Sequence, residues 1–157
     1  MFVNPLPSAE VLRDLFRYDA ETGILTRAAD GKVMGSSNGH YLQLYMDGRK
    51  YLVHRVIWKM VTGSEPLQID HEDLNKMNNR WLNLRSATKT QNEANRPARK
   101  DNRLGCKGVS LTKSGKFCVR IFDGQKWWCR TFASLDEARS AHLNKSIALF
   151  GDFARAA

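Results

Sequence analysis

The stretch Ile69–Arg96, IDHEDLNKMNNRWLNLRSATKTQNEANR, decides how the middle of the chain must fold. A short strand is predicted to lead directly into Asp70 and His71. A polar, asparagine-rich loop follows at 72–79. Residues 88–95 contain neither glycine nor proline, so they are compatible with a helix. The order strand, long loop, helix therefore puts polar functional groups at both ends of the loop.

The rest of this stretch is expected to serve the fold. Three apolar residues, Trp81, Leu82 and Leu84, should return the chain to the hydrophobic core after the loop. Asparagine favours turns for local reasons, because its side chain hydrogen-bonds nearby main-chain groups. Four asparagines are assigned to loop geometry on that ground: Asn75, Asn78, Asn79 and Asn95.

The remaining side chains suit hydrolysis of a phosphodiester bond. That reaction needs an activated water, and one hard divalent cation can neutralise the phosphate and stabilise the departing oxygen. Asp70 and Asn92 offer oxygen ligands that suit Mg²⁺. His71 can activate the water, and Asn83 can tie the loop across and fix the His71 backbone or ring. A purely structural reading, in which these Asp and Asn residues only cap turns, stays open on the residues alone.

The charge balance points to a polyanionic partner. The 157 residues include 25 Lys and Arg against 16 Asp and Glu, a formal charge of +9. Small, strongly basic proteins commonly bind nucleic acid, although a basic surface can also serve solubility alone. Residues 97–157 hold 12 basic and 5 acidic side chains, whereas residues 1–96 hold 13 and 11. Most of the positive charge is therefore expected to act in the C-terminal third.

The sequence argues against several other classes of protein. The three cysteines form no C-x-x-C pair, which argues against a structural zinc site and a disulfide framework. No apolar run approaches the roughly 20 residues that span a membrane, and the N-terminus is not a signal peptide. We expect a protein of the cytoplasm with no membrane partner, existing as a monomer or weak dimer.

The N-terminal half shows alternating helix and strand signals. The predicted elements are a helix at 9–18, a strand at 24–27, a loop at 30–40, a hairpin at 41–53 and a helix at 54–61. Asp47-Gly48 between two apolar runs is a strong hairpin signal. His54, which opens the last of these helices, is interpreted as a packing residue. Arg55 beside it fits either a phosphate contact or an ordinary surface charge.

A second unit follows a linker that begins at Pro97. Strands are predicted at 108–112, 116–123 and 126–133, and a capping box, Ser134 to Glu137, begins a helix that ends near Phe150. If this helix covers the Phe117–Ile121 face of the sheet, alternation leaves four side chains on the opposite face: Arg120, Lys126, Trp128 and Arg130. Such a basic and aromatic surface could read a major groove. The alternative is that Trp128 caps the edge of the core.

Three phrases between His54 and Asn95, HRVIW, IDHEDLNKMNNRWLNLR and QNEANR, resemble the HNH endonucleases of phages and homing introns. The lead-in LRDLFRYDAETGILT through GRKYLVHR also looks like phage members, so the resemblance covers nearly all of residues 8–96. It implies a ββα-metal core at about 50–96 within a nuclease domain at 1–96. It also implies a phage protein acting in a bacterial host cell.

The resemblance assigns separate roles to four positions. His71 would be the general base, Asp70 and Asn92 the metal ligands, and Asn83 the residue that constrains the loop. The implied reaction is hydrolysis of DNA to 5′-phosphate and 3′-hydroxyl ends with Mg²⁺ or Mn²⁺. This sequence has the variant with Asn instead of His at position 92, which is a weaker ligand. Three cations in or beside the loop could clamp phosphates or be ordinary surface charges: Lys76, Arg80 and Arg85.

The C-terminal unit, residues 105–157 after a linker at 97–104, resembles the APETALA/ERF-type DNA-binding domain. The matching features are SGKF, the W-x-x-T-F strand end and the closing FG-F-A. The resemblance implies that sheet side chains enter the major groove, among them Lys107, Arg120, Lys126 and Trp128. Ser110 and Thr112 stand where plant members often have arginine, and Arg130 replaces a glycine, so base preference cannot be transferred.

The sequence thus predicts an α+β protein: a ββα-metal nuclease unit followed by a three-stranded antiparallel sheet packed on one helix. The leading hypothesis is a DNA endonuclease anchored on double-stranded DNA by the C-terminal sheet. One metal site per chain predicts nicking of one strand. The rival hypothesis is a non-catalytic, sequence-specific DNA-binding regulator, and a binder of structured RNA is a third possibility that only the charge supports.

Overall fold

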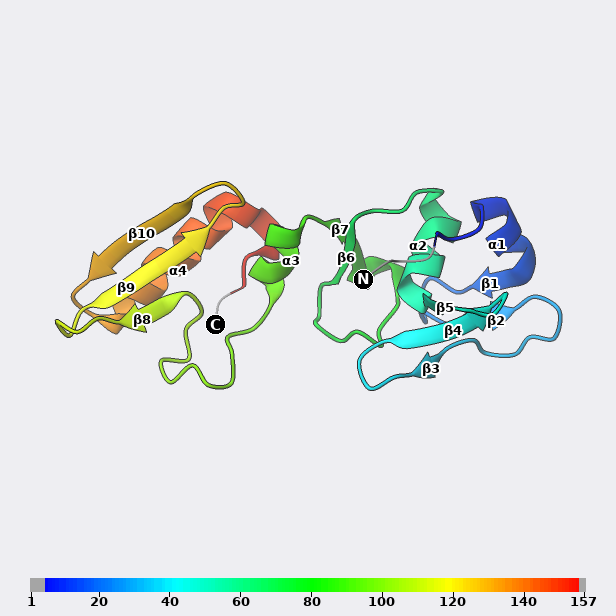
Figure 1. The fold of residues 1–157 in the computed structure, drawn as a ribbon, viewed down its shortest axis with the longest axis horizontal. Helices are drawn as coiled ribbons and strands as arrows, with labels where there is room; N and C mark the ends of the chain where they lie inside the picture. Colours follow the sequence, from blue (N-terminus) through cyan, green and yellow to red (C-terminus); the bar gives the residue numbers. More distant parts are fainter. Residues whose placement is uncertain (1–4, 156–157) are drawn as a thin grey trace. The chain divides into compact units, whose positions relative to one another are not determined.

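The computed structural model describes residues 5–155, which divide into two units between Ala87 and Thr88 (Figure 1). The sequence expectation put the end of the first domain at residue 96. The helix that follows Thr88 is therefore grouped with the C-terminal sheet instead of with the first unit. No helix among the described residues is long and apolar enough to cross a membrane.

The first unit combines helices with three small antiparallel sheets, β1–β2, β3–β4–β5 and β6–β7. Its elements are α1 (Ala9–Leu15), β1 (Phe16–Tyr18), β2 (Leu25–Arg27), β3 (Ser36–Ser37), β4 (Leu42–Met46), β5 (Arg49–Leu52), α2 (Val53–Thr62), β6 (Gln68–His71), the 3-10 helix η1 (Trp81–Asn83) and β7 (Leu84–Ala87).

The predicted hairpin at Asp47-Gly48 forms between β4 and β5. Both turn residues have positive φ, 50° and 70°, which is the conformation of a type I′ turn and matches the twist of the flanking strands. Helix α2 follows β5 at once and ends at Gly63, whose φ of 72° caps the helix in the left-handed region. Two of the strongest local signals in the sequence therefore behave as expected.

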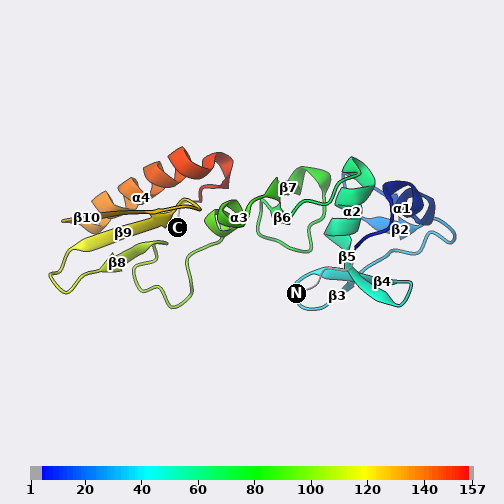
Figure 2. The ribbon, with the colours of Figure 1, turned by 45° about the horizontal axis from the view of Figure 1, so that its top comes forward.

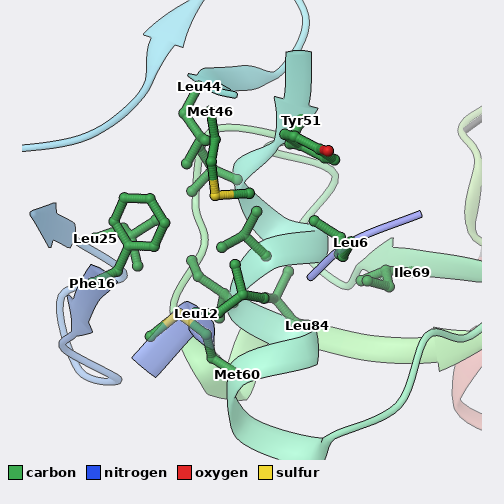
Figure 3. Packing of buried hydrophobic residues seen from close by; sticks show 13 residues of the cluster. Leu6, Leu12, Phe16, Leu25, Leu44, Met46, Tyr51, Met60, Ile69 and Leu84 are labelled. Carbon is green, nitrogen blue, oxygen red and sulfur yellow. The ribbon is translucent and has the colours of Figure 1, made fainter. Parts of the chain in front are cut away.

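The core of the first unit surrounds α2 (Figure 3). Val56 and Ile57 of α2 are fully buried, and α1 contributes Leu12. Apolar side chains from the sheets close over them, including Leu25, Leu44, Met46, Tyr51, Ile69 and Leu84. Because Ile69 and Leu84 belong to β6 and β7, this core holds the β6–β7 hairpin in place.

Two local expectations were wrong. The first helix ends at Leu15 instead of residue 18, because Phe16–Tyr18 pairs with β2 as a strand. Leu82 does not join the core and is 92% exposed. It occupies the middle of η1, where three residues per turn send successive side chains in different directions. Trp81 packs on Trp58, and Leu84 is buried as expected.

The second unit contains α3 (Lys89–Asn95), β8 (Val109–Leu111), β9 (Phe117–Phe122), β10 (Trp127–Phe132), α4 (Leu135–Phe150) and η2 (Gly151–Phe153). The three strands form one antiparallel sheet in the order β10–β9–β8. Helix α4 lies along one face of this sheet, as Figure 2 shows. The predicted sheet of three strands with one long helix is therefore present.

Helix α4 begins and packs for reasons that are visible in the sequence. The Ser134 side chain accepts a hydrogen bond from the Glu137 N–H at 3.2 Å, and the Glu137 carboxylate accepts one from the Ser134 N–H. This reciprocal capping box fixes the first turn. The small side chain of Ala138 is fully buried against Val119 and Ile121 of β9, which brings the helix close to the sheet.

Candidate active site and nucleic-acid surface

The hairpin β6–β7 places Asp70 and His71 at the end of a buried strand. In the antiparallel register Asp70 lies opposite Arg85, and His71 lies opposite Leu84. Asp70 and His71 are both only 4% exposed. A charged or titratable side chain is rarely buried unless it has polar partners. The polar partners of Asp70 and His71 therefore define the site.

Asn83 closes the polar loop that follows β6. Its side-chain oxygen accepts a hydrogen bond from the Asp73 N–H at 2.9 Å. Its amide nitrogen donates to the Asp73 carboxylate at 2.9 Å and to the Asn78 main-chain oxygen at 2.7 Å. The Glu72 N–H also donates to the Asn83 main-chain oxygen at 3.0 Å. Asn83 therefore joins the two ends of the loop, and none of these four bonds is to the His71 ring.

The His71 ring is instead held by Asn79. The distance between His71 Nε2 and Asn79 Oδ1 is 3.1 Å, and Asn79 is only 2% exposed. The sequence interpretation had assigned Asn79 to loop geometry together with Asn75 and Asn78. Those two do form local turn bonds, to the Met77 and Arg80 N–H groups. Asn79 differs because it is buried, and neighbouring asparagines in one loop carry no sequence signal that separates them.

The hydrogen bond that Asn79 accepts determines the tautomer of the His71 imidazole. Because Oδ1 can only accept, His71 Nε2 carries the proton in this arrangement, and Nδ1 keeps a lone pair. Burial lowers the pKa of His71, against the opposing effects of Asn79, Asp73 and Asp70. The ring is thus a neutral base at neutral pH, which is the state that proton abstraction from water requires.

His54 packs against this ring and carries no positive charge. The two ring centres are 5.1 Å apart in an edge-to-face arrangement, and Tyr41 lies 5.2 Å from His54. Burial, with smaller contributions from His71 and Arg55, lowers the pKa of His54 to about 3. Its position in the core agrees with the packing role inferred from the sequence. Lys76 is exposed beside the site, with its ammonium 4.8 Å from the centre of the Tyr41 ring.

Asp70 forms an ion pair with Arg85 across the hairpin. Arg85 Nε donates to Asp70 Oδ2 at 2.9 Å, and both side chains are largely buried. The sequence interpretation had placed Arg85 among the phosphate contacts. The ion pair gives it a second role, because a cation beside Asp70 stabilises the buried carboxylate.

The donor chemistry of the expected ligands fits a hard divalent cation. Among the residues that the structure describes, no group of three or more His, Cys, Asp or Glu side chains gathers in a way that could hold a metal ion. The expected pair of Asp70 and Asn92 is a different set, one carboxylate and one amide oxygen, which suits Mg²⁺ or Mn²⁺ more than zinc. Asp70 lies in the first unit, and Asn92 lies on α3 of the second.

The register of β9 and β10 corrects the face assignment in the second unit. Side chains directly opposite each other in an antiparallel pair share a face. Trp128 lies opposite Ile121, and Arg130 opposite Val119, so both belong to the face that α4 covers. Placing Trp128 and Arg130 on the open face beside Arg120 was therefore wrong. Lys126 precedes β10, in the turn where its N–H donates to Asp123 Oδ1 at 2.8 Å.

The open face carries a different aromatic residue. Cys129 lies opposite Arg120, and Trp127 lies opposite Phe122, so these four share the face away from α4. Trp127 is 66% exposed and its ring centre is 5.2 Å from that of Phe122. The sequence KWWCR offers two adjacent tryptophans for the core. Only the pairing with β9 selects Trp128, whose ring lies under Lys145 of α4 at 5.9 Å.

Lys107 is held by the end of helix α3. Its ammonium donates to the main-chain oxygens of Glu93, of Ala94 at 3.0 Å and of Arg96 at 3.1 Å. Burial lowers the pKa of this lysine. A cation at a helix C-terminus satisfies carbonyl groups that lack partners within the helix. A DNA contact for Lys107 stays a prediction, and it would compete with these bonds.

Comparison with known proteins identifies the central segment only. Residues 51–94 match the family model described as HNH endonuclease. No curated protein and no solved structure was found to match the chain. The matched segment contains all four positions to which the resemblance gave roles, Asp70, His71, Asn83 and Asn92. The comparison thus supports a nuclease and DNA-binding role for residues 51–94, and an HNH endonuclease domain is what this part of the chain resembles.

Proposed function

We propose that this protein is a metal-dependent DNA endonuclease that hydrolyses phosphodiester bonds. The observation that carries the proposal is the buried, neutral imidazole of His71, held through Nε2 by Asn79 and adjacent to the carboxylate of Asp70. In this tautomer the Nδ1 atom of His71 carries the lone pair that can accept a proton. The match of residues 51–94 to HNH endonucleases supports the same reaction class.

Each residue then has one task. His71 Nδ1 accepts a proton from the attacking water. Asp70 and Asn92 would hold Mg²⁺ or Mn²⁺, which when bound supplies charge neutralisation at the phosphate and at the departing oxygen. Asn83 keeps the loop closed around the site through its bonds to Asp73 and Asn78. The products carry 5′-phosphate and 3′-hydroxyl ends, and one site per chain makes the product a nick.

The second unit supplies a DNA-binding surface. Residues 88–157 contain 14 Lys and Arg against 6 Asp and Glu, so this unit carries nearly all of the net positive charge. The open face of its sheet presents Arg120 with the exposed ring of Trp127. Of the four side chains that the sequence predicts on this face, Arg120 is the strand residue that lies there. A basic and aromatic sheet face suits contacts to phosphates and bases of duplex DNA.

Incubation with supercoiled plasmid tests the activity. The wild type with Mg²⁺ or Mn²⁺ should convert supercoiled plasmid to the nicked circle, and a chelator should abolish the conversion. His71→Ala should slow nicking by about 10²- to 10⁴-fold, the usual contribution of a general base. His40→Ala is the matched control, because His40 is exposed in the loop between β3 and β4.

A plasmid that is bound but never cut would favour the alternative function. A gel shift without any nicking, over a range of divalent metals, would show that the chain is a DNA-binding regulator that does not cleave. The same outcome would leave the DNA surface of the second unit in place. A protein that neither binds nor cuts would overturn both readings.

A further inference from the structure

We propose that the turn between β1 and β2, which lies outside the segment that matches the HNH family, positions the general base through Asn79. The residues that make the contact are Tyr18, Ala20 and Gly23, and we call them the N-terminal brace. The proposal rests on the proposed function for the role of His71 in the reaction. The chain of contacts itself stands on the geometry of the first unit.

The turn that carries the brace residues is closed by hydrogen bonds of its own. The Asp19 N–H donates to the Ile24 oxygen at 3.0 Å, and the Gly23 N–H donates to the Asp19 oxygen at 2.9 Å. The Asp19 carboxylate also accepts from the Glu21 N–H at 2.9 Å. These bonds within residues 19–24 close the turn locally. A rigid turn can therefore act as a support for another segment.

Two hydrogen bonds join the brace to the loop that carries Asn79. The Tyr18 hydroxyl donates to the Asn79 main-chain oxygen at 2.8 Å. The Trp81 N–H donates to the Ala20 oxygen at 3.0 Å. Burial raises the pKa of Tyr18 to about 12, so its hydroxyl keeps the proton that it donates. The two bonds lie on either side of Arg80 in the chain and so fix the main chain at Asn79 and Arg80.

Gly23 allows this contact to be made backbone against backbone. A Cβ atom added at Gly23 would lie 2.5 Å from the Arg80 nitrogen and 2.7 Å from the Asn79 carbonyl carbon. Both distances are shorter than real contacts of this kind. Gly23 also has a φ of +77°, which side chains other than that of glycine rarely adopt. The turn and the loop are thus in direct main-chain contact, and a side chain at this position would separate them.

The state of Asn79 itself indicates that its oxygen is needed by His71. Among the residues that the structure describes, the Asn79 amide nitrogen is buried with no hydrogen-bond partner. Leaving a buried donor unpaired is unfavourable, so an asparagine kept only for loop geometry would turn this group to a partner or to water. The brace fixes the main chain of Asn79, and the side chain then reaches the His71 ring.

The consequence for the reaction is the tautomer of His71. With Asn79 Oδ1 accepting from Nε2, the lone pair stays on Nδ1, where a water can be deprotonated. Without that bond the Nε2–H tautomer loses the acceptor that favours it, so the other neutral tautomer becomes populated as well. Asn79 is therefore a positioning residue in contact with the base, and Tyr18 and Gly23 are positioning residues that act through Asn79.

Nitrogen-15 NMR of the imidazole in the metal-free protein tests the first contact, independently of activity. We expect wild-type His71 to show one tautomer with the proton on Nε2. Asn79→Ala should show a mixture of tautomers at unchanged DNA affinity. It should nick plasmid about 10- to 100-fold more slowly, which is the usual effect of removing a hydrogen-bonding partner of an active-site group. Asn79→Asp retains an oxygen acceptor and should retain the Nε2–H tautomer. A single Nε2–H tautomer in Asn79→Ala would overturn the proposal.

A pair of glycine variants tests the brace. Gly23→Ala and Gly31→Ala impose similar backbone strain, with φ of +77° and +71°, but nothing lies within 4 Å of a Cβ at Gly31. We expect Gly23→Ala to mix the His71 tautomers and slow nicking, whereas Gly31→Ala should do neither. Tyr18→Phe, with the exposed Tyr45→Phe as control, asks the same question without added strain. Equal effects of both glycine variants, or a wild-type tautomer in Tyr18→Phe and Gly23→Ala, would overturn the role of the brace.

The NMR readout separates this proposal from the proposed function. A wild type that fixes the tautomer through Asn79 but never nicks DNA would preserve the positioning contacts and remove their use in DNA cleavage. A wild type that nicks DNA while His71 shows both tautomers would preserve the nuclease and overturn the positioning role. Where Asn79→Ala does not fold, Asn79→Asp and Tyr18→Phe decide the outcome.

Discussion

The two buried histidines of the first unit illustrate how one residue type is used in two ways. His54 and His71 touch edge to face, and burial lowers the pKa of both. His71 has a polar partner, Asn79, and a carboxylate neighbour, whereas the contacts of His54 are with aromatic rings. His54 therefore contributes a neutral packing surface, and His71 contributes a lone pair.

The pKa of His54 predicts that acid destabilises the first unit. Its folded-state pKa of about 3 lies below the ordinary value of 6.5, so the unfolded chain binds more protons between these two values. The free energy of unfolding should therefore fall by about 1.4 kcal/mol per pH unit as the pH drops below 6.5, and level off near the folded pKa. Urea titrations followed by the amide NMR signals of α2 measure this slope. His54→Gln, which does not titrate, should show a flatter dependence, and an equal slope would contradict the assignment.

The ion pair of Asp70 and Arg85 gives a prediction about metal binding. Arg85→Met leaves the Asp70 carboxylate buried without this partner, which should lower the free energy of unfolding by about 3 kcal/mol in the metal-free protein. Saturating Mg²⁺ should recover part of that loss, because a bound cation replaces the lost charge. Thermal unfolding with and without Mg²⁺ measures both effects. Arg80→Met, on an exposed loop residue, should show neither.

At the scale of single residues, the sequence pointed to candidate catalytic residues but not to the residue that holds the His71 ring. Asp70, His71 and Asn83 stood out because their residue types suit hydrolysis of a phosphodiester. Asn79 did not stand out, because only its burial beside the His71 ring distinguishes it from the other asparagines of the loop. The main chain at Asn79 is held by Tyr18, which is 61 positions earlier in the chain. Local composition cannot report such a distant contact.

At the scale of elements, turn and capping signals in the sequence predicted the strand ends in the second unit. They did not predict which side chains of β10 lie on which face of the sheet. A strand alternates with a period of two, so an error of one residue exchanges the two faces completely. The adjacent tryptophans, Trp127 and Trp128, satisfy the core equally well by composition. The register with β9 decides that Trp128 lies on the core side, and this register is set by the Asp123-Gly124 turn and by α4.

The corrected faces predict different effects for two arginines on neighbouring strands. Arg120→Ala, on the open face, should weaken binding to duplex DNA about 5- to 10-fold and lower the salt dependence of binding by about one phosphate contact. Arg130→Ala removes the same charge from the face covered by α4 and should change the affinity less than about twofold. Affinity titrations at several salt concentrations measure both. The opposite ranking would place the DNA on the helix side.

Two cysteines offer a direct check of the same register. Cys118 and Cys129 share the open face, and their sulfur atoms are 3.4 Å apart across β9 and β10. A short bifunctional thiol reagent should therefore link Cys118 to Cys129 within one chain. Cys118 is buried, as Cys106 is, but Cys118 lies next to the exposed Cys129, so Cys106 in the core cluster should stay unlinked. Mass spectrometry of the digested product identifies the linked pair, and a link between Cys129 and Cys106 would be incompatible with the register.

At the scale of the whole molecule, the family match and the structural division do not coincide. The match to HNH endonucleases extends over 51–94, whereas the first unit ends at Ala87. Helix α3, which carries Asn92, contacts α4 and η2 and is capped by Lys107. The sequence suggested a boundary near Pro97, because proline and basic residues are typical of linkers, but this helix is supported by residues that come after it.

Truncation should reveal this dependence. A fragment of residues 1–96 should keep the fold of residues 5–87 but lose the helical structure of α3, because the partners of that helix are missing. We expect the fragment to lose nicking activity as well as most of its affinity for DNA. The amide NMR signals of α3 and the plasmid assay measure the two losses. Full activity of the fragment would show that α3 needs neither Lys107 nor α4.

The close approach of Gly23 to Arg80 has a practical meaning for protein engineering. A nuclease cassette cut out at residues 51–94 and grafted onto a new carrier would leave behind the turn that receives the Asn79 carbonyl. The smallest portable module must instead start no later than Phe16, the first residue of β1. Chimeras that begin there should retain the orientation of the His71 ring, whereas shorter ones would lack the contacts that hold Asn79 against it.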